Sequence, residues 1–480
     1  MYLNSTLFKL FTFIFYIDVY FYRKLTIYPD VQDLTTEDLK ILCDAYRKNN
    51  FIDPETSEKL GVKRGLRNSD GTGVLAGLTN ICDVIGYEKD GDKIIPIDGK
   101  LIYRGIDLND IVNEAITKDR FLFEEVVWLL LFGSLPDEKT LNQFHTILET
   151  HRELPDGFAE TQIMAAPSPN LMNKMARSVL AMYSYDEEAE NTSLENIIKQ
   201  SINLIAEMPS MMVYAYQTKK HAYNHESLYF HYPKPGLSTA ENILAMYRLD
   251  QNYTHEEAKL LDLLMVVHAD HGGGNNSAFT TRVLSSTGTD TYSAIASAIL
   301  SLKGPKHGGA NLMVMKQLDE ILDNVKDVND DDEMKTYLSK IIRKEAGDHS
   351  GLIYGIGHAV YTKSDPRAQI LKQYSKNLAY EKGLAREYDC LCQIEKLAPV
   401  VFKEIKGSTK NVCANVDLFS GLVYRILGIS EDLFTPIFAL SRVAGWCSHR
   451  MEEVEFANRI IRPAYKYVGT SRDYISLENR

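Results

Sequence analysis

The apolar side chains of this chain recur every three or four residues over long stretches, and this spacing limits the folds available to it. Such spacing places apolar groups along one face of an α-helix. It runs through residues 121–131, 141–148, 171–182 and 194–216. Segments with the alternating pattern of a β-strand are scarce. The sequence therefore predicts a mostly α-helical fold.

One segment departs from the helical pattern. Residues 93–103, KIIPIDGKLIY, place β-branched runs on both sides of Asp98-Gly99. An Asp-Gly pair between such runs is typical of the two-residue turn of a β-hairpin. We therefore expect a minor N-terminal β-hairpin within residues 93–103, with its turn at Asp98-Gly99.

Length, charge and cysteine content narrow the class of protein. The chain has 480 residues, of which 45% are hydrophobic, enough for a sizeable core. A net charge of −12 argues against a general nucleic-acid or membrane-surface binder. The six cysteines form no CxxC pair, so neither a structural zinc site nor a disulfide framework is indicated. We expect a reducing compartment, the cytoplasm.

The first 22 residues are aromatic-rich, but Lys9 and Asp18 interrupt them. A membrane-spanning helix needs about 20 consecutive apolar residues, and a signal peptide needs a basic start and a small-residue cleavage site. Neither description fits this segment. We expect residues 1–30 to be a leader outside the folded unit, without stable membrane association. A weak membrane anchor is the alternative.

A histidine lies in a tight elbow between two predicted helices. Residues 294–302 are apolar and small, and Lys303-Gly304-Pro305 is a typical helix stop. A new periodic run begins at Leu312, just beyond the small residues that follow His307. Small neighbours let a ligand approach His307, and the following helix points its free N–H groups toward it. Taken alone, a histidine in a glycine turn is usually an ordinary surface turn.

Four other segments carry polar residues in unusual settings, and each alone has a structural explanation. The spacing H-x-D-H is not a recognised zinc pattern, and GIGHAV lacks the third glycine of a dinucleotide loop. The aspartate of NVD could be a helix N-cap, and arginines usually lie on solvated faces. The segments are His268 to Ser277, Gly355 to Arg367, Asn415 to Asp417, and the series Arg442, Arg450, Arg459 and Arg462.

Considered together, these groups suit carbon–carbon bond formation on a dicarboxylate. Arginine forks bind carboxylates bidentately. A carboxylate base removes a carbon-bound proton efficiently only when a placed donor stabilises the enolate oxygen. A second donor must polarise the keto group of the acceptor. The sequence offers three histidines in glycine-rich turns, one aspartate and several arginines for these tasks.

The motifs GPKHGGAN, GIGHAV followed by DPR, and NVDLFSG, with HADH upstream, resemble the citrate synthase family from about Thr72 to the C-terminus. The resemblance implies the all-α, two-domain citrate synthase fold and a homodimer. We expect residues 31–308 and 419–480 to form a large helical domain, and residues 309–418 to form a smaller one that closes over the substrates.

The resemblance also implies an activity: condensation of acetyl-CoA with oxaloacetate and hydrolysis of citryl-CoA to citrate, the first step of the tricarboxylic acid cycle. Asp417 would take the methyl proton of acetyl-CoA. His307 would donate a hydrogen bond to the thioester oxygen. His358 would donate a hydrogen bond to the oxaloacetate carbonyl and protonate it. No metal and no cofactor is expected, since acetyl-CoA is a substrate.

Five further residues match binding positions of the family. His271, Arg367 and Arg442 would bind oxaloacetate, and Arg462 would reach it from the partner subunit. Lys363 would contact CoA. The sequence departs from the family pattern next to His271. The following position is often acidic in the family and is Gly272 here.

Three alternatives remain open at this point. A 2-methylcitrate synthase would share the motifs and use propionyl-CoA, because one methylene in an apolar pocket is worth only about 1–3 kcal/mol. A non-catalytic helical oligomer could keep the fold, although it would have no physical need for His307, His358 and Asp417 together. A metal-binding protein is the third alternative.

Overall fold

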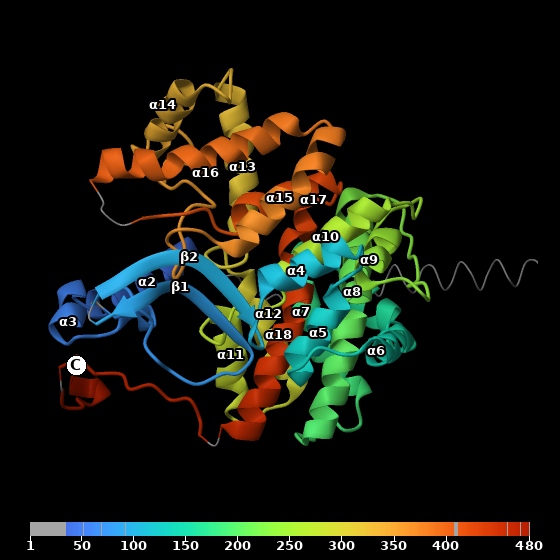
Figure 1. The fold of residues 1–480 in the computed structure, drawn as a ribbon. Helices are drawn as coiled ribbons and strands as arrows, with labels where there is room; N and C mark the ends of the chain where they lie inside the picture. The colour runs from blue at the N-terminus through green and yellow to red at the C-terminus, as the bar shows by residue number, and fades with distance from the viewer. Residues whose placement is uncertain are drawn as a thin grey trace, which may run out of the picture. The chain divides into compact units, whose positions relative to one another are not determined.

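The computed structural model describes residues 35–50, 52–68, 70–91, 93–407, 411–457, 459–470 and 472–479 (Figure 1). The chain separates into two compact units. One comprises the chain ends, Met1–Val74 and Ala464–Arg480, and the other is Leu75–Pro463. The predicted leader, residues 1–30, lies outside the described residues.

The unit of the chain ends contains helix α2 (Thr36–Asn49), which begins with two reciprocal hydrogen bonds. The Thr35 side chain accepts the N–H of Asp38 at 3.1 Å, and the Asp38 carboxylate accepts the N–H of Thr35 at 3.1 Å. This reciprocal pair is a capping box. The other elements are α3 (Pro54–Lys59), η1 (Arg64–Leu66) and η5 (Leu477–Asn479).

The second unit opens with a three-stranded antiparallel sheet of order β1-β2-β3. The strands are β1 (Cys82–Asp90), β2 (Lys93–Tyr103) and β3 (Ile106–Asp107). The predicted N-terminal β-hairpin is present and is formed by β1 and β2, but its predicted position within 93–103 is wrong, because this whole segment is one strand. Asp98-Gly99 is not a turn but lies beside the irregularity where the pairing register shifts between Ile85 and Tyr87.

Close backbone packing explains the glycine of Asp98-Gly99. The Gly99 N–H donates to the carbonyl of Ser364 at 3.2 Å, and a side chain on Gly99 would collide with that carbonyl. A Cβ on Gly86, on the neighbouring strand, would lie 2.5 Å from the carbonyl oxygen of Val360. The two glycines thus let residues 360–364 dock directly on the hairpin formed by β1 and β2.

The remaining elements of this unit are helical, as the spacing of apolar residues predicts. The four periodic segments correspond to α5, α6, α7 and α8, so the all-α class is confirmed. The helices are α4 (Leu108–Thr117), α5 (Phe123–Phe132), α6 (Glu138–Thr150), α7 (Leu171–Met182), α8 (Leu194–Asn224), α9 (Thr239–Tyr247), α10 (His255–His268), α11 (Asn276–Ser285), α12 (Thr291–Lys303), α13 (Ala310–Asn324), α14 (Asp331–Ile342), α15 (Pro366–Glu381), α16 (Ala385–Lys406), α17 (Asp417–Ile426) and α18 (Phe434–Phe456), with short helices η2 (Ala159–Met164), η3 (Tyr183–Tyr185) and η4 (Glu431–Leu433).

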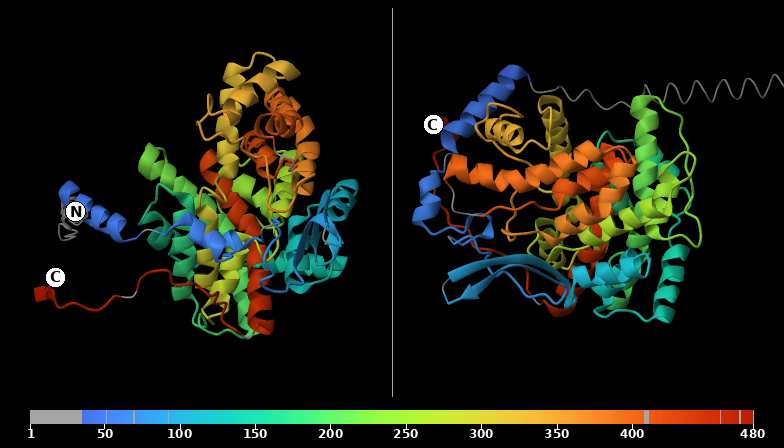
Figure 2. Two further views of the ribbon diagram at one scale, coloured as in Figure 1. Left: turned by 90° about the vertical axis from the view of Figure 1, so that its left-hand side faces the viewer. Right: turned by 45° about the horizontal axis from the view of Figure 1, so that its top comes forward.

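Helix α18 lies in the middle of this unit. It packs against α5, α8, α10, α11 and α12, and almost all of its residues from Phe434 to Met451 are buried. The polar side chains of a helix surrounded in this way must find hydrogen-bond partners within the protein. Helices α13 to α16 pack among themselves and on α17, and Figure 2 shows them gathered on one side of α18. No helix in the described part of the chain is long and apolar enough to cross a membrane.

The docking of residues 360–364 on the hairpin predicts a stability effect. Gly99→Ala should lower the free energy of unfolding by about 1–3 kcal/mol, because the added methyl group collides with the Ser364 carbonyl and the Tyr361 ring. Urea unfolding measures this difference. Gly77→Ala is the matched control, since a Cβ at Gly77 meets no atom within 4 Å. Equal stability of the two variants would contradict the proposed packing.

Candidate active site

His307 lies in the predicted elbow between α12 and α13. Helix α12 ends at Lys303, and α13 begins after Gly309, so the predicted elbow is confirmed. The N–H of Gly308 donates to the carbonyl of Leu302 at 2.9 Å, and there is no room for a side chain at Gly308. Thr435, near the start of α18, donates to the Gly308 carbonyl at 2.9 Å. The elbow is therefore fixed from two sides.

A buried serine contacts the His307 ring. His307 Nε2 lies 3.3 Å from the Ser277 hydroxyl, which accepts the indole N–H of Trp446 at 3.1 Å. The one hydroxyl hydrogen of Ser277 goes either to Asn275 Oδ1, at 2.9 Å, or to His307 Nε2. Burial, aided by the charge of Arg442, lowers the pKa of His307 to about 4. The ring is therefore neutral at pH 7.

His358 is held in one tautomer by the backbone. Its Nδ1 accepts the N–H groups of Val360 at 3.0 Å and Tyr361 at 2.9 Å. These bonds require a bare Nδ1, so a neutral His358 carries its proton on Nε2. The ring stacks on Tyr361 with the centroids 4.6 Å apart, and the Tyr361 hydroxyl donates to the Lys100 carbonyl at 3.2 Å. The docked segment 360–364 thus orients His358.

Asp417 is the first residue of α17, and it is not the N-cap. The N-cap position is occupied by Val416, and the N–H of Asp417 donates to Asn415 Oδ1 at 3.0 Å. Within the described parts of the chain, no group donates a hydrogen bond to the Asp417 carboxylate. Burial and the nearby Asp365 raise the pKa of Asp417 to about 6, although Arg367 and Arg442 oppose this shift. The capping explanation for this residue does not hold.

Arg442 is a fully buried cation with two open donors. Its Nε donates to the carbonyl of His268, and its guanidinium lies 4.8 Å from the centre of the Phe438 ring. Nη1 and Nη2 have no hydrogen-bond partner among the described residues. Burial lowers the pKa of Arg442 to about 10, so it remains charged at neutral pH. A bound carboxylate would satisfy both Nη groups.

Arg367 shares its guanidinium with an aspartate of the same motif. Its Nε and Nη2 donate to the Asp365 carboxylate at 3.1 and 2.8 Å. Burial would lower the pKa of Arg367, but Asp365 raises it above its usual value. Asp365 also caps α15 and accepts the N–H of Val416 at 3.2 Å. Arg367 is thus joined to the segment that carries Asp417.

His271 lies among the other predicted site residues. It is 9% exposed, and its Nε2 has no hydrogen-bond partner in the described structure. Its ring meets the His358 ring edge-on, with the centroids 5.1 Å apart. Burial lowers its pKa well below the usual value, and nearby positive charges add to this effect. Those charges belong to Arg367 and Arg442.

Two of the predicted site residues, Arg462 and Lys363, are exposed. Arg462 is exposed beyond the end of α18, and no described contact joins it to the other site residues of its own chain. Lys363 is half-exposed and forms an ion pair with Asp98 at 2.7 Å. The structure therefore brings together six of the eight predicted residues: His271, His307, His358, Arg367, Asp417 and Arg442.

The sequence interpretation missed several supporting residues. Asp365 could have been found, because Asp-Pro is a common N-cap and first residue of a helix. Trp446 lies one helical turn after Arg442, so a shared face was also predictable. The roles of Ser277 and Tyr361 depend on contacts that the local sequence does not reveal. No three His, Cys, Asp or Glu side chains in the described residues are arranged to hold a metal ion.

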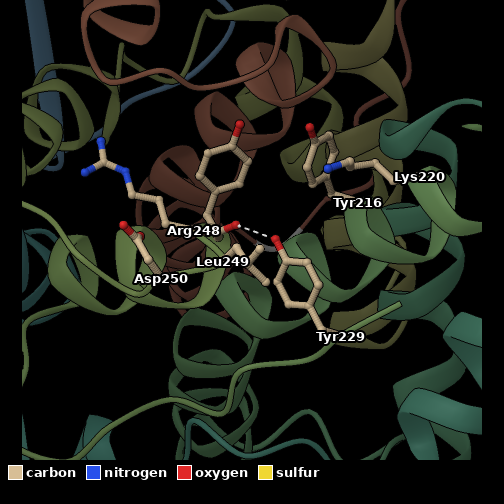
Figure 3. Close-up of a pocket in the computed structure, with 7 residues that line it drawn as sticks. Tyr216, Lys220, Tyr229, Arg248, Leu249 and Asp250 are labelled. Carbon is tan, nitrogen blue, oxygen red and sulfur yellow. Dashed lines mark hydrogen bonds between the residues drawn. The ribbon is translucent and has the colours of Figure 1, made fainter. Parts of the chain in front are cut away.

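A concavity lined by none of these residues lies elsewhere in the structure (Figure 3). It has a volume of about 470 Å³. Lys220 forms an ion pair with Glu226, and Arg248 with Glu257, so both of its cations are engaged. Its lining residues are Tyr216, Lys220, Tyr229, Tyr247, Arg248, Leu249 and Asp250.

Comparison with known proteins links this geometry to one family. The model for "Citrate synthase, C-terminal domain" matches residues 68–464. The citrate synthase of Haloferax volcanii is 36% identical over 79% of this chain and 91% of the relative. A 2-methylcitrate synthase of Shewanella oneidensis is 33% identical over 79% of this chain and 92% of the relative.

A solved structure extends the similarity to the fold. It is a ternary complex of Thermoplasma acidophilum citrate synthase with carboxymethyl coenzyme A and oxaloacetate, with a TM-score of 0.71 and 27% sequence identity. The similarity covers 87% of this chain and 99% of the solved chain.

The raised pKa of Asp417 predicts how activity depends on pH. A reaction that uses this carboxylate as its base should slow about tenfold for each pH unit below 6, since the protonated form is inactive. It should level off above pH 7. Initial rates at low substrate concentration, measured from pH 5 to 8, give kcat/KM for this test. An undiminished kcat/KM at pH 5 would contradict the assignment of Asp417 as the base.

Proposed function

The chain belongs to the citrate synthase family, and we propose that His307, His358 and Asp417 perform the reaction in this member. The enzyme condenses the acetyl group of acetyl-CoA with oxaloacetate and hydrolyses citryl-CoA, giving citrate and CoA. This reaction is the first step of the tricarboxylic acid cycle.

In the first step Asp417 removes a proton from the methyl group of acetyl-CoA. A carboxylate with a pKa of about 6 is ionised at pH 7, yet it is a stronger base than an ordinary aspartate. No hydrogen bond to a described residue needs to be broken before this carboxylate reacts. The electron pair of the broken C–H bond moves toward the thioester oxygen, which becomes an enol or enolate oxygen.

His307 stabilises this oxygen as a neutral donor. We assign the Ser277 hydroxyl hydrogen to His307 Nε2 during the reaction, while Asn275 Oδ1 keeps the N–H of Ser277 at 3.2 Å. His307 then carries its proton on Nδ1, which donates to the thioester oxygen. The low pKa of His307 supports this role, because the ring stays neutral while the enolate forms.

His358 acts on the other substrate. Its Nε2–H donates to the keto oxygen of oxaloacetate and gives up the proton as the carbon–carbon bond forms. The two backbone N–H groups that bond Nδ1 stabilise the electron density that builds on the ring during this transfer. Water then hydrolyses citryl-CoA in the closed site.

Arginines and one histidine bind the carboxylates of oxaloacetate. The two open Nη groups of Arg442 form a fork for one carboxylate, and this observation carries the proposal most strongly. His271 Nε2 and the part of Arg367 that is not bonded to Asp365 add further donors. In a homodimer, Arg462 of one subunit reaches the site of the other. CoA binding by Lys363 requires its ion pair with Asp98 to open.

We also propose a domain division, an oligomeric state and a cellular compartment. Residues 31–308 and 419–480 form the large domain and residues 309–418 the small one, which is supported by the mutual packing of α13 to α16. The enzyme works in the cytoplasm as a homodimer, without a metal or cofactor. A second candidate, 2-methylcitrate synthase, is favoured by the relative from Shewanella oneidensis.

Asp417→Asn tests the assignment of the base. Turnover should fall by a factor of about 100 or more, because an amide cannot accept the methyl proton. Oxaloacetate binding, measured by calorimetry, should stay within about threefold of wild type, since Asp417 does not bind its carboxylates. Asp319→Asn, in a surface ion pair with Arg425, is the control. Near-normal turnover in Asp417→Asn would rule out this assignment.

A further inference from the structure

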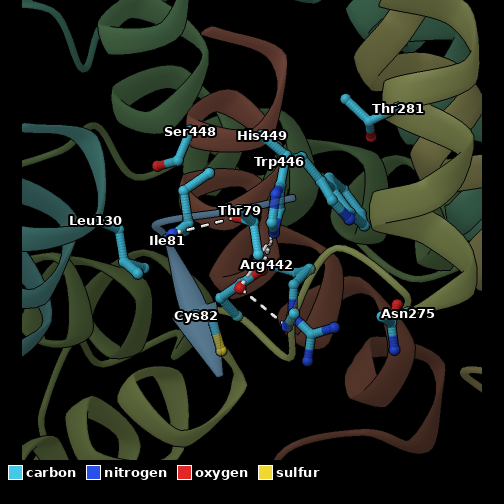
Figure 4. A network of polar contacts seen from close by, with 12 residues as sticks. Thr79, Ile81, Cys82, Leu130, Asn275, Thr281, Arg442, Trp446, Ser448 and His449 are labelled. Carbon is cyan, nitrogen blue, oxygen red and sulfur yellow. Dashed lines mark hydrogen bonds and ion pairs between the residues drawn. The ribbon is translucent and has the colours of Figure 1, made fainter. Parts of the chain in front are cut away.

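A buried polar network on α18 reaches the turn that carries His271. Its side chains lie on one face of the helix, because Arg442, Trp446, His449 and Glu453 follow at three- or four-residue spacing. Figure 4 shows Arg442, Trp446 and His449 leaving the same helix. Two of these, His449 and Glu453, have no role in the proposed reaction, although both are almost completely buried.

The turn at residues 268–272 is docked tightly on α18. The N–H of Gly445 donates to the carbonyl of Ala269 at 3.2 Å. A Cβ on Gly445 would lie 2.6 Å from that carbonyl oxygen and would also collide with the Asp270 carboxylate. The Nε of Arg442 bonds the carbonyl of His268. Consecutive residues just before His271 are therefore fixed on the helix.

Asp270 is fully buried, and both of its carboxylate oxygens are occupied. Oδ2 accepts the N–H of Gly272 at 3.0 Å, and both oxygens lie 3.2 Å from His449 Nε2. Burial would raise the pKa of Asp270, but His449, Arg442 and the Gly272 N–H hold it below its usual value. The carboxylate is therefore ionised next to His271.

Arg282 determines which nitrogen of His449 carries the proton. Its Nη2 lies 2.8 Å from His449 Nδ1, and an arginine can only donate. Nδ1 therefore accepts, and Nε2 donates to Asp270. Arg282 is itself fixed by Glu453 at 2.9 Å and by Glu452. The network fixes one direction for every hydrogen bond from Glu453 to Asp270.

The Asp270 carboxylate also lies within electrostatic reach of Arg442. Its charge partly offsets the lowering of the Arg442 pKa by burial, but no hydrogen bond joins the two side chains in the described structure. Buried charged side chains are usually paired with a group of opposite charge. Here the Asp270 carboxylate bonds His449 and Gly272 instead. The Nη groups of Arg442 have no hydrogen-bond partner in the described structure.

We propose that His449 and Asp270 are positioning residues for oxaloacetate. His449 binds the Asp270 carboxylate and thereby keeps it from pairing with Arg442, while both residues hold the turn that presents His271. The inference rests on the proposed function, in which Arg442 and His271 bind oxaloacetate. Removing the His449 donor releases Asp270 to compete with the substrate for the Arg442 fork.

A pair of substitutions tests this role. His449→Asn removes the group at the Nε2 position, whereas His449→Gln reaches that position and keeps a donor for Asp270. In His449→Asn the KM for oxaloacetate should rise tenfold or more. The KM for acetyl-CoA, and kcat at saturating oxaloacetate, should change less than threefold. His449→Gln should restore the oxaloacetate KM to within threefold of wild type. Ser448→Ala is the control, since in the described structure its hydroxyl donates to the Ala444 carbonyl of its own helix and to no other group.

The competing charge is tested in an Asp270→Asn background. There, adding His449→Asn should raise the oxaloacetate KM by less than twofold, because no carboxylate remains to pair with Arg442. If His449→Asn does not fold, Arg282→Gln replaces it and should raise the same KM, since the tautomer of His449 is then no longer fixed.

Two outcomes are distinguishable. An unchanged oxaloacetate KM in folded His449→Asn, or equal changes in the KM for both substrates, overturns the positioning role and leaves the proposed function intact. If the wild-type enzyme does not condense acetyl-CoA with oxaloacetate, the proposed function itself fails.

Discussion

The site depends on one constraint: a positive charge, Arg442, that is completely buried and has two donors without a partner in the described structure. Leaving such groups unsatisfied costs about 1–3 kcal/mol each, and more when the group is charged. The surrounding fold keeps them in this state. The Phe438 ring supports the guanidinium, and the His268 carbonyl holds its Nε. The site is thus already shaped for an anion.

The same burial sets the protonation of the remaining groups. Low solvation and nearby cations keep His307 and His271 neutral, which suits a donor of hydrogen bonds. Burial acts in the opposite direction on Asp417 and makes its carboxylate a stronger base. Acid and base roles therefore follow from one environment acting on different chemical groups. Helix α18 contacts several parts of the site, because its Thr435, Arg442 and Trp446 donate hydrogen bonds to Gly308, His268 and Ser277.

Local patterns predicted much of this structure. The periodic segments became helices α5 to α8, and the elbow at His307 lies where the helix stop predicts. The turn predicted at Asp98-Gly99 is wrong because a turn and a site of close backbone approach favour the same small residue, glycine. The partner that decides between them, Ser364, is distant in sequence. The same holds for the bonds from Arg282 to His449 and from Trp446 to Ser277, which no local pattern encodes.

The most direct test of the account is release of free CoA thiol in the presence of oxaloacetate, with acetyl-CoA and propionyl-CoA compared at matched concentrations. We expect rapid release that depends on oxaloacetate and is faster with acetyl-CoA. A preference for propionyl-CoA would instead identify a 2-methylcitrate synthase. Release with neither substrate would contradict the central claim, because a site with this geometry would then not form the carbon–carbon bond.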